Sequence, residues 1–104
     1  AFLSFFVQKF VDAAVIETGM PRELANRLVS EMMLGTGQLL TGGGFTPETL
    51  QQRVSVPGGV TAEGLRMLQH ELNDVFHELI RTTHAKYRDD VDKVHSMFYG
   101  SRVD

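Results

Sequence analysis

The sequence predicts an all-α protein. Along most of its 104 residues, apolar side chains recur in steps of three or four, which is the spacing of one face of a helix. No segment shows the strict alternation of apolar and polar residues that is typical of a strand. Glycine and proline gather between the periodic segments and divide the chain into helices. We expect these helices to form a single domain over residues 1–104.

The first expected helix covers Phe2–Thr18. Its polar positions 4, 8 and 12 recur every fourth residue, and apolar side chains fill most of the remaining circumference. This pattern predicts a helix that is buried on most of its surface. Gly19 ends it, and Pro21, which has no N–H group to leave unpaired, fits the first turn of the next helix.

A second helix is expected from about Pro21 to about Thr41. It contains Gly35 and Gly37, each of which costs a helix about 1 kcal/mol relative to alanine. We therefore expect another backbone to pack closely at these two glycines. Three consecutive glycines at positions 42–44 end the helix.

A short third helix is expected to end at about Val54. Thr46 is a good N-cap, Pro47 suits the first turn, and Glu48 places an acid near the positive end of the helix dipole. The segment 55–61 then interrupts the helical pattern with a proline and two glycines. Thr61 is the expected N-cap of the helix that follows.

From Ala62 onward no helix breaker occurs before Gly100, and apolar residues continue in steps of three or four. As one helix, the segment from Thr61 to Phe98 would span about 57 Å. A domain of this length has a radius of gyration of only about 13 Å. We therefore expect either a break, near His84, or a far half that packs on a second subunit.

Composition excludes several classes of function. Ten Lys and Arg stand against thirteen Asp and Glu, with a net charge of −3 and no block of like charge, which argues against nucleic-acid binding. The apolar run at 2–16 is too short and too interrupted to cross a bilayer and lacks a cationic leader. With no cysteine, a reducing cytoplasmic location is expected. Because the chain begins at Ala1 inside an apolar run, we interpret it as part of a longer protein.

One segment, Pro57–Thr61, has the properties of a binding site. Gly58 and Gly59 allow a ligand to approach the backbone, and the following helix directs unpaired N–H groups and its positive end toward that ligand. Such a turn can hold a carboxylate or a phosphate. On spacing alone, an ordinary loop with a capping threonine is the simpler interpretation, because glycine pairs usually mark turns.

The longer segment Val54–Gln69 resembles the signature of the pyrroline-5-carboxylate reductase family, in which a Pro-Gly-Gly-x-Thr turn opens a helix. Residues 12–15 and 19–25 are similar to parts of the family's first two helices, and residues 33–40 to the end of the second. These matches occur in order and cover about residues 1–88.

The resemblance implies an all-α dimerisation domain whose helices interleave with those of a second subunit. In this family a separate Rossmann domain binds NAD(P)H, and the Gly-x-Gly segment at 35–37 lacks the third glycine of that fold. The cofactor domain is therefore expected outside this chain. The implied reaction is hydride transfer from NAD(P)H to the C=N bond of a cyclic imino acid, giving proline. The implied assembly is a homodimer or a higher oligomer.

The resemblance also implies individual roles at the turn. The backbone N–H groups of Gly59, Val60 and Thr61 would receive the substrate carboxylate. The Thr61 hydroxyl would approach the imine nitrogen and the nicotinamide, as the catalytic and cofactor-facing group. Val56 stands where the family usually has a hydroxyl residue, and losing one charge-strengthened hydrogen bond costs about 1.5–3 kcal/mol of binding. The expected substrate-binding residues are Ser55, Gly58, Gly59, Val60 and Thr61.

Other departures leave a second function open. Residues 70–73 read His-Glu-Leu-Asn where the family tends to have a glycine pair. Together with residues 8–14 and 84–87, they are similar to a paralogue encoded with late-competence genes in Bacillus-like bacteria. The alternative function is therefore a non-enzymatic module that only assembles a dimer. A free-standing helical interaction domain is a third hypothesis.

The histidines do not predict a metal site. His70, His77 and His84 lie seven residues apart, which separates successive side chains by about 10.5 Å along a helix, too far to share one metal ion. Asp74 with His77, and Asp92 with His95, have the carboxylate-x-x-His spacing of helical dimetal sites. Such sites also need glutamates from two further helices.

Overall fold

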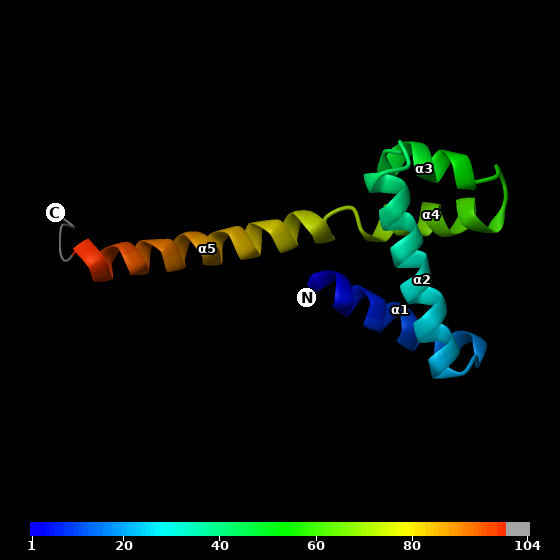
Figure 1. Cartoon of the computed structure of the whole chain (residues 1–104), viewed down its shortest axis with the longest axis horizontal. Coiled ribbons are helices and arrows are strands. Elements are labelled where there is room, and N and C mark those ends of the chain that lie inside the picture. Colours follow the sequence, from blue (N-terminus) through cyan, green and yellow to red (C-terminus); the bar gives the residue numbers. More distant parts are fainter. Residues whose placement is uncertain (100–104) are drawn as a thin grey trace. The chain divides into compact units, whose positions relative to one another are not determined.

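The computed structural model describes residues 1–99, and in that range the chain is helical without strands. The described residues form five helices, which are labelled in sequence order in Figure 1. The predicted all-α class with a long C-terminal helix is confirmed. None of the described helices is both long and apolar enough to span a membrane. The helices are α1 (Phe2–Thr18), α2 (Arg22–Thr41), α3 (Pro47–Val54), α4 (Val60–Glu71) and α5 (Val75–Tyr99).

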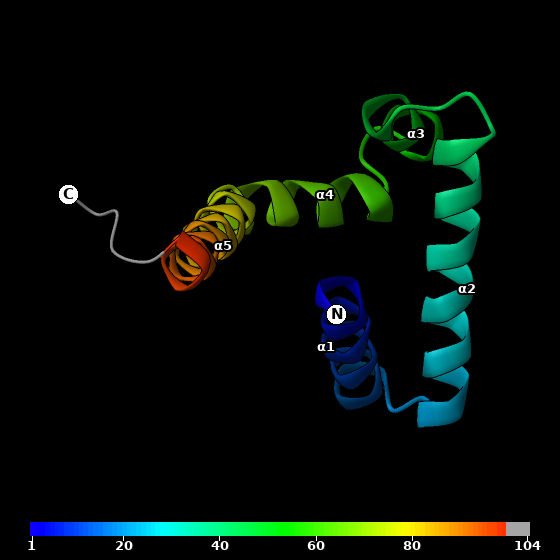
Figure 2. The same ribbon diagram turned by 60° about the vertical axis from the view of Figure 1, so that its left-hand side comes forward.

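The chain divides into two compact units, Ala1–Val54 and the part from Ser55 onward. In the first unit α1 and α2 pack side by side as a helical hairpin (Figure 2). Gly19 ends α1 as predicted: its φ of 76° is left-handed, and its N–H donates to the carbonyl of Val15 at 3.0 Å. Arg22 and Asp12 then form an ion pair of 2.7 Å between the two helices.

The core of this hairpin is small. Val11, Ala25 and Val29 are its fully buried residues, and Val7, Ala14, Val15 and Met20 pack against them. The prediction that the first helix is buried on most of its surface is wrong for the single chain. Its exposed large side chains are Phe2, Leu3, Phe5, Phe6, Phe10 and Ile16.

The two interior glycines of α2 have empty space where a side chain would lie. A Cβ atom added at Gly35 or Gly37 would meet nothing within 4 Å. Within the described part of the chain, no backbone makes the close approach that we predicted.

Helix α3 begins as the sequence predicts. The Thr46 hydroxyl accepts from the N–H of Thr49 at 3.2 Å, and the Thr49 hydroxyl accepts from the N–H of Thr46 at 2.9 Å. This reciprocal pair satisfies two backbone donors that have no partner within the helix. Helix α3 packs on α2 within the first unit.

In the second unit the long helical pattern breaks at 72–74, between α4 and α5, and not near His84. Leu72 closes α4 by donating to the carbonyl of Leu68 at 2.8 Å, and α5 restarts where the N–H of Glu78 donates to the carbonyl of Asp74 at 3.0 Å. Asparagine and aspartate compete for backbone hydrogen bonds and so favour helix ends over helix interiors. Asn73 and Asp74 therefore separate the helices, whereas His84 lies inside an unbroken α5.

Candidate functional site

The segment predicted to bind substrate forms a tight turn. The carbonyl of Val56 accepts a hydrogen bond from the N–H of Gly59 at 2.8 Å, which closes four residues. Pro57 is the second residue of this turn and Gly58 is the third, with a φ of 77°. A positive φ at the third position is characteristic of a type II turn, and proline followed by glycine favours it. The local sequence therefore specifies the turn.

Helix α4 begins earlier than the sequence predicts. The expectation that Thr61 is the N-cap is wrong: Gly59 is the N-cap, and Thr61 is the second residue of the helix. The turn explains the difference, because Gly59 is held in an extended conformation while its carbonyl accepts the N–H of Glu63 at 3.1 Å. A Cβ atom at Gly59 would lie 3.1 Å from the carbonyl oxygen of Val56, so this position is crowded.

The turn leaves three backbone donors open at the start of α4. The N–H groups of Val60, Thr61 and Ala62 have no hydrogen-bond partner among residues 1–99, as is usual for the first turn of a helix. The N–H of Gly59 is already bonded to Val56, so its predicted role as a free donor to the substrate is not met in this structure. Open N–H groups at the start of a helix are a general feature that can receive a carboxylate or a phosphate.

The two hydroxyl residues of the segment differ in accessibility. Thr61 is exposed, and its Oγ1 makes no hydrogen bond within the described chain. Ser55 Oγ is inaccessible to solvent and lacks a hydrogen-bond partner among the described residues. The turn thus brings Gly58, Val60 and Thr61 to one exposed end of α4, whereas the Ser55 hydroxyl is enclosed.

Sequence reasoning missed two features of this end of α4. One is the N–H of Ala62, which becomes an open donor once the helix begins at Val60. The other is an ion pair of 3.0 Å between Glu63 and Arg66, both mostly exposed. This pairing offsets part of the negative charge that Glu63 places near an anion site. Their i, i+3 spacing was a visible signal for the pair.

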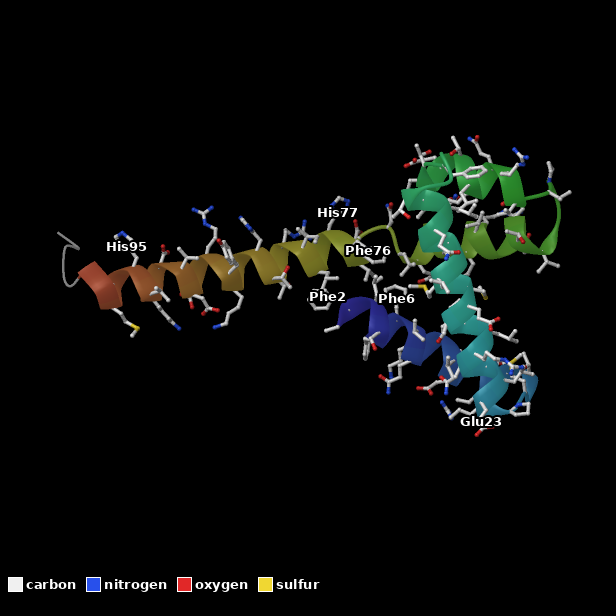
Figure 3. All side chains as sticks on the ribbon, in the orientation of Figure 1. Phe2, Phe6, Glu23, Phe76, His77 and His95 are labelled. Carbon is white, nitrogen blue, oxygen red and sulfur yellow. The ribbon has the colours of Figure 1, made fainter. Side chains whose placement is uncertain are left out.

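The histidine candidates do not converge. Among residues 1–99, no group of three or more His, Asp or Glu side chains is arranged to hold a metal ion. His77 and His95 both lie on α5, one near its start and one near its end (Figure 3). The two carboxylate-x-x-His pairs therefore stay separate within the chain.

Comparison with known proteins tests the family resemblance. The chain matches the family described as pyrroline-5-carboxylate reductase dimerisation over residues 1–90. The chain belongs to this family.

Curated relatives include both predicted branches of the family. ComE operon protein 4 of Bacillus subtilis is 40% identical over 95% of this chain and 36% of its own length. Pyrroline-5-carboxylate reductase of Thermus thermophilus is 36% identical over 77% of this chain and 30% of its own length. The Escherichia coli reductase is 32% identical over 68% of this chain and 26% of its own length. The predicted similarity to a late-competence paralogue is confirmed.

The chain spans about a third, or less, of the length of these relatives. No solved structure matches it. Membership of the pyrroline-5-carboxylate reductase dimerisation family thus rests on the sequence match, which contains the whole turn from Val56 to Thr61.

Proposed function

We propose that this chain is the dimerisation and substrate-side part of a pyrroline-5-carboxylate-reductase-like oxidoreductase, as one domain over residues 1–104. The observation that carries this proposal is the exposed end of α4, where the N–H groups of Val60, Thr61 and Ala62 are open. They fit the carboxylate of a cyclic imino acid better than they fit a neutral ligand, because the helix dipole adds a positive partial charge.

In this proposal, the turn binds and orients the substrate. Hydrogen bonds to a charged carboxylate contribute about 1.5–3 kcal/mol each, so two or three of them suffice to fix the ring. The exposed Thr61 hydroxyl donates to the imine nitrogen, which makes the C=N carbon more electrophilic and places a proton source where the amine forms.

NAD(P)H, bound by a domain outside these residues, would supply the hydride that adds to the C=N carbon. Of the residues described here, only Thr61 is assigned toward the nicotinamide. The donor set at α4 fits the substrate carboxylate, and no strand followed by a glycine-rich dinucleotide turn occurs in residues 1–99.

Homodimer formation is the second part of the proposal, and a higher oligomer is compatible with it. Helix α1 leaves large apolar side chains exposed, among them Leu3 at 66%, Phe5 at 58% and Ile16 at 77%. A second subunit would cover them. The absence of cysteine supports a cytoplasmic location.

The test uses the whole protein that carries this chain. With pyrroline-5-carboxylate as substrate, we expect NADPH oxidation, and we expect Thr61→Ala to lower kcat on the order of 100-fold, as does loss of one transition-state hydrogen-bond donor. Thr82→Ala, at another exposed threonine, on α5, serves as the matched control and should leave turnover unchanged. A kcat in Thr61→Ala equal to that of the unchanged protein would contradict the assignment of Thr61 to the active site.

A second candidate function is supported by Val56. This residue stands where the family usually has a hydroxyl, and the neighbouring Ser55 Oγ is enclosed and cannot take its place. The similarity to ComE operon protein 4 points the same way. In this alternative the module assembles a dimer without catalysis. A dimer that oxidises no NADPH with pyrroline-5-carboxylate would favour it, whereas a dinucleotide fingerprint elsewhere in the whole protein would favour the enzyme.

A further inference from the structure

The end of α4 differs from the ends of α1 and α2. Helix α1 ends at Gly19 with a left-handed φ of 76°, and α2 ends at three consecutive glycines. The break between α4 and α5, visible in Figure 1 as a short coil, consists of Leu72, Asn73 and Asp74, none of which has a positive φ. No glycine or proline at this break prevents the helix from continuing.

Side-chain hydrogen bonds do not hold the break open either. Among residues 1–99, the side chains of Asn73 and Asp74 make no hydrogen bond, so α5 begins without the kind of cap that Thr46 provides for α3. Leu72 has a φ of −97° and a ψ of 9°, and both angles lie within about 50° of their α-helical values. A modest backbone rotation at 72–74 would therefore join α4 to α5.

The apolar positions on either side of the break fit one continuous helix. Five apolar side chains follow each other across it in steps of 3, 4, 3 and 4, and this spacing places them on one face of a helix. They are Leu65, Leu68, Leu72, Val75 and Leu79. In the broken form this face is divided between two helices.

The energies that favour the two forms are similar in size. Joining the helices would pair backbone groups that the end of α4 and the start of α5 leave to water, and each added residue is favoured by a factor of at most about 1.6. Asparagine and aspartate oppose this, because each lowers the ratio of helix to non-helix about threefold relative to alanine. Both forms should therefore be populated.

We propose that residues 72–74 are a two-state hinge, at which α4 and α5 convert between the separate helices of this structure and one continuous helix. The candidate site lies at the start of α4 and the hinge at its end, so the conversion reorients the site relative to α5. A ligand at α4 and a protein contact along α5 would each shift this equilibrium if they favour one form, and each would then alter the affinity for the other. The hinge is a property of the fold and does not depend on the proposed function.

A distance between two spin labels tests the hinge, because the chain has no cysteine of its own. Arg66→Cys on α4 and Ser96→Cys on α5 are exposed positions, and a continuous helix would separate them by about 45 Å. Any bend at 72–74 shortens this distance. Double electron–electron resonance on the labelled chain, diluted with unlabelled copies so that distances within one chain dominate, should show about 45 Å and a shorter distance.

Two variants should shift the hinge in opposite directions. Asn73→Ala combined with Asp74→Ala should raise the ratio of the 45 Å form to the shorter form about tenfold, at about threefold for each residue. Val75→Pro should remove the 45 Å form, because proline suits the first residue of α5 but not the interior of a helix. Asp92→Ala, within the unbroken α5, is the matched control and should leave the ratio unchanged.

A ratio that the two alanines leave unchanged, including a single distance shared by both chains, would overturn the proposal. A 45 Å form that survives Val75→Pro would also overturn it. NADPH oxidation and the mass of the particle test the proposed function separately, so a failure of the hinge leaves that proposal intact.

Discussion

Gly58 shows how the conformation of a single residue determines the path of the chain at the candidate site. Its φ of 77° is left-handed, a conformation that costs residues with a Cβ atom about 1–2 kcal/mol. This angle lets the chain reverse after Pro57, so that Gly59 can close the turn on Val56. The turn thereby makes Gly59 the N-cap of α4 and decides which three N–H groups are open.

Gly58→Ala should therefore lower the free energy of unfolding by about 1–2 kcal/mol, through conformation alone. No neighbour lies within 4 Å of a Cβ atom added there, so steric contact adds nothing. Gly64→Ala is the matched control, because Gly64 lies in the interior of α4 with equally open space. That substitution should raise stability by about 0.5–1 kcal/mol. Urea denaturation measures the free energy of unfolding of both variants. If both substitutions raised it, or both lowered it, the left-handed conformation of Gly58 would not explain the result.

The candidate site also shows where residue preferences stop predicting geometry. Threonine and glycine are about equally common N-caps, but the threonine hydroxyl can also accept a backbone N–H, which is why Thr61 was expected there. The structure uses Gly59 instead, because the type II turn fixes this residue in an extended conformation. The turn residues were predictable from Pro57 and Gly58, whereas the register of the helix depended on a hydrogen bond between Val56 and Gly59.

At the scale of helices, the sequence predicted the ends that a glycine or a capping residue marks. It did not predict the helix end that has neither. Gly19 and Thr46 mark helix boundaries by conformation and capping, and both predictions are confirmed. The break at 72–74 contains neither glycine nor proline, and the apolar periodicity continues through it. The sequence pattern therefore predicted one helix where the structure has two. The signal was present in Asn73 and Asp74, whose side chains favour helix ends. The surroundings of Gly35 were predicted wrongly, because the helix cost of a glycine does not reveal whether another backbone packs beside it; a Cβ atom added at Gly35 meets nothing within 4 Å.

Packing between α1 and α2 depends on few side chains, so each of them should contribute measurably to the free energy of unfolding. Val11 is 1% exposed and sits at the centre of the small core. Val11→Ala removes two buried carbon atoms and should lower the free energy of unfolding by about 1.5–2 kcal/mol. Ile16→Val, at a position 77% exposed on the same helix, should change it by less than about 0.5 kcal/mol. Thermal or urea unfolding measures the change in the free energy of unfolding for both variants. Equal changes would show that the core is not centred on Val11.

For the whole molecule, the main fact is how much apolar surface a single chain leaves uncovered. Helix α1 alone leaves Phe2, Leu3, Phe5, Phe10 and Ile16 each more than half exposed. Obligate dimers bury about 2,000–5,000 Å² in total and have apolar interfaces. We therefore expect a second subunit to cover these side chains and to enlarge the small core of the single chain.

This surface predicts both the mass of the particle and its response to salt. The chain has a mass of 11.6 kDa, so light scattering at micromolar concentration should give about 23 kDa, or a multiple of it for a higher oligomer. Raising NaCl to about 1 M should not dissociate the dimer, because screening weakens ion pairs between exposed charges while apolar burial is retained. The ion pairs Arg22–Asp12, Arg66–Glu63, Arg81–Glu78, Lys86–Asp90 and Lys93–Asp89 are partly or largely exposed and contribute little to either state. A stable monomer at micromolar concentration, or a dimer that dissociates in high salt, would contradict an apolar interface.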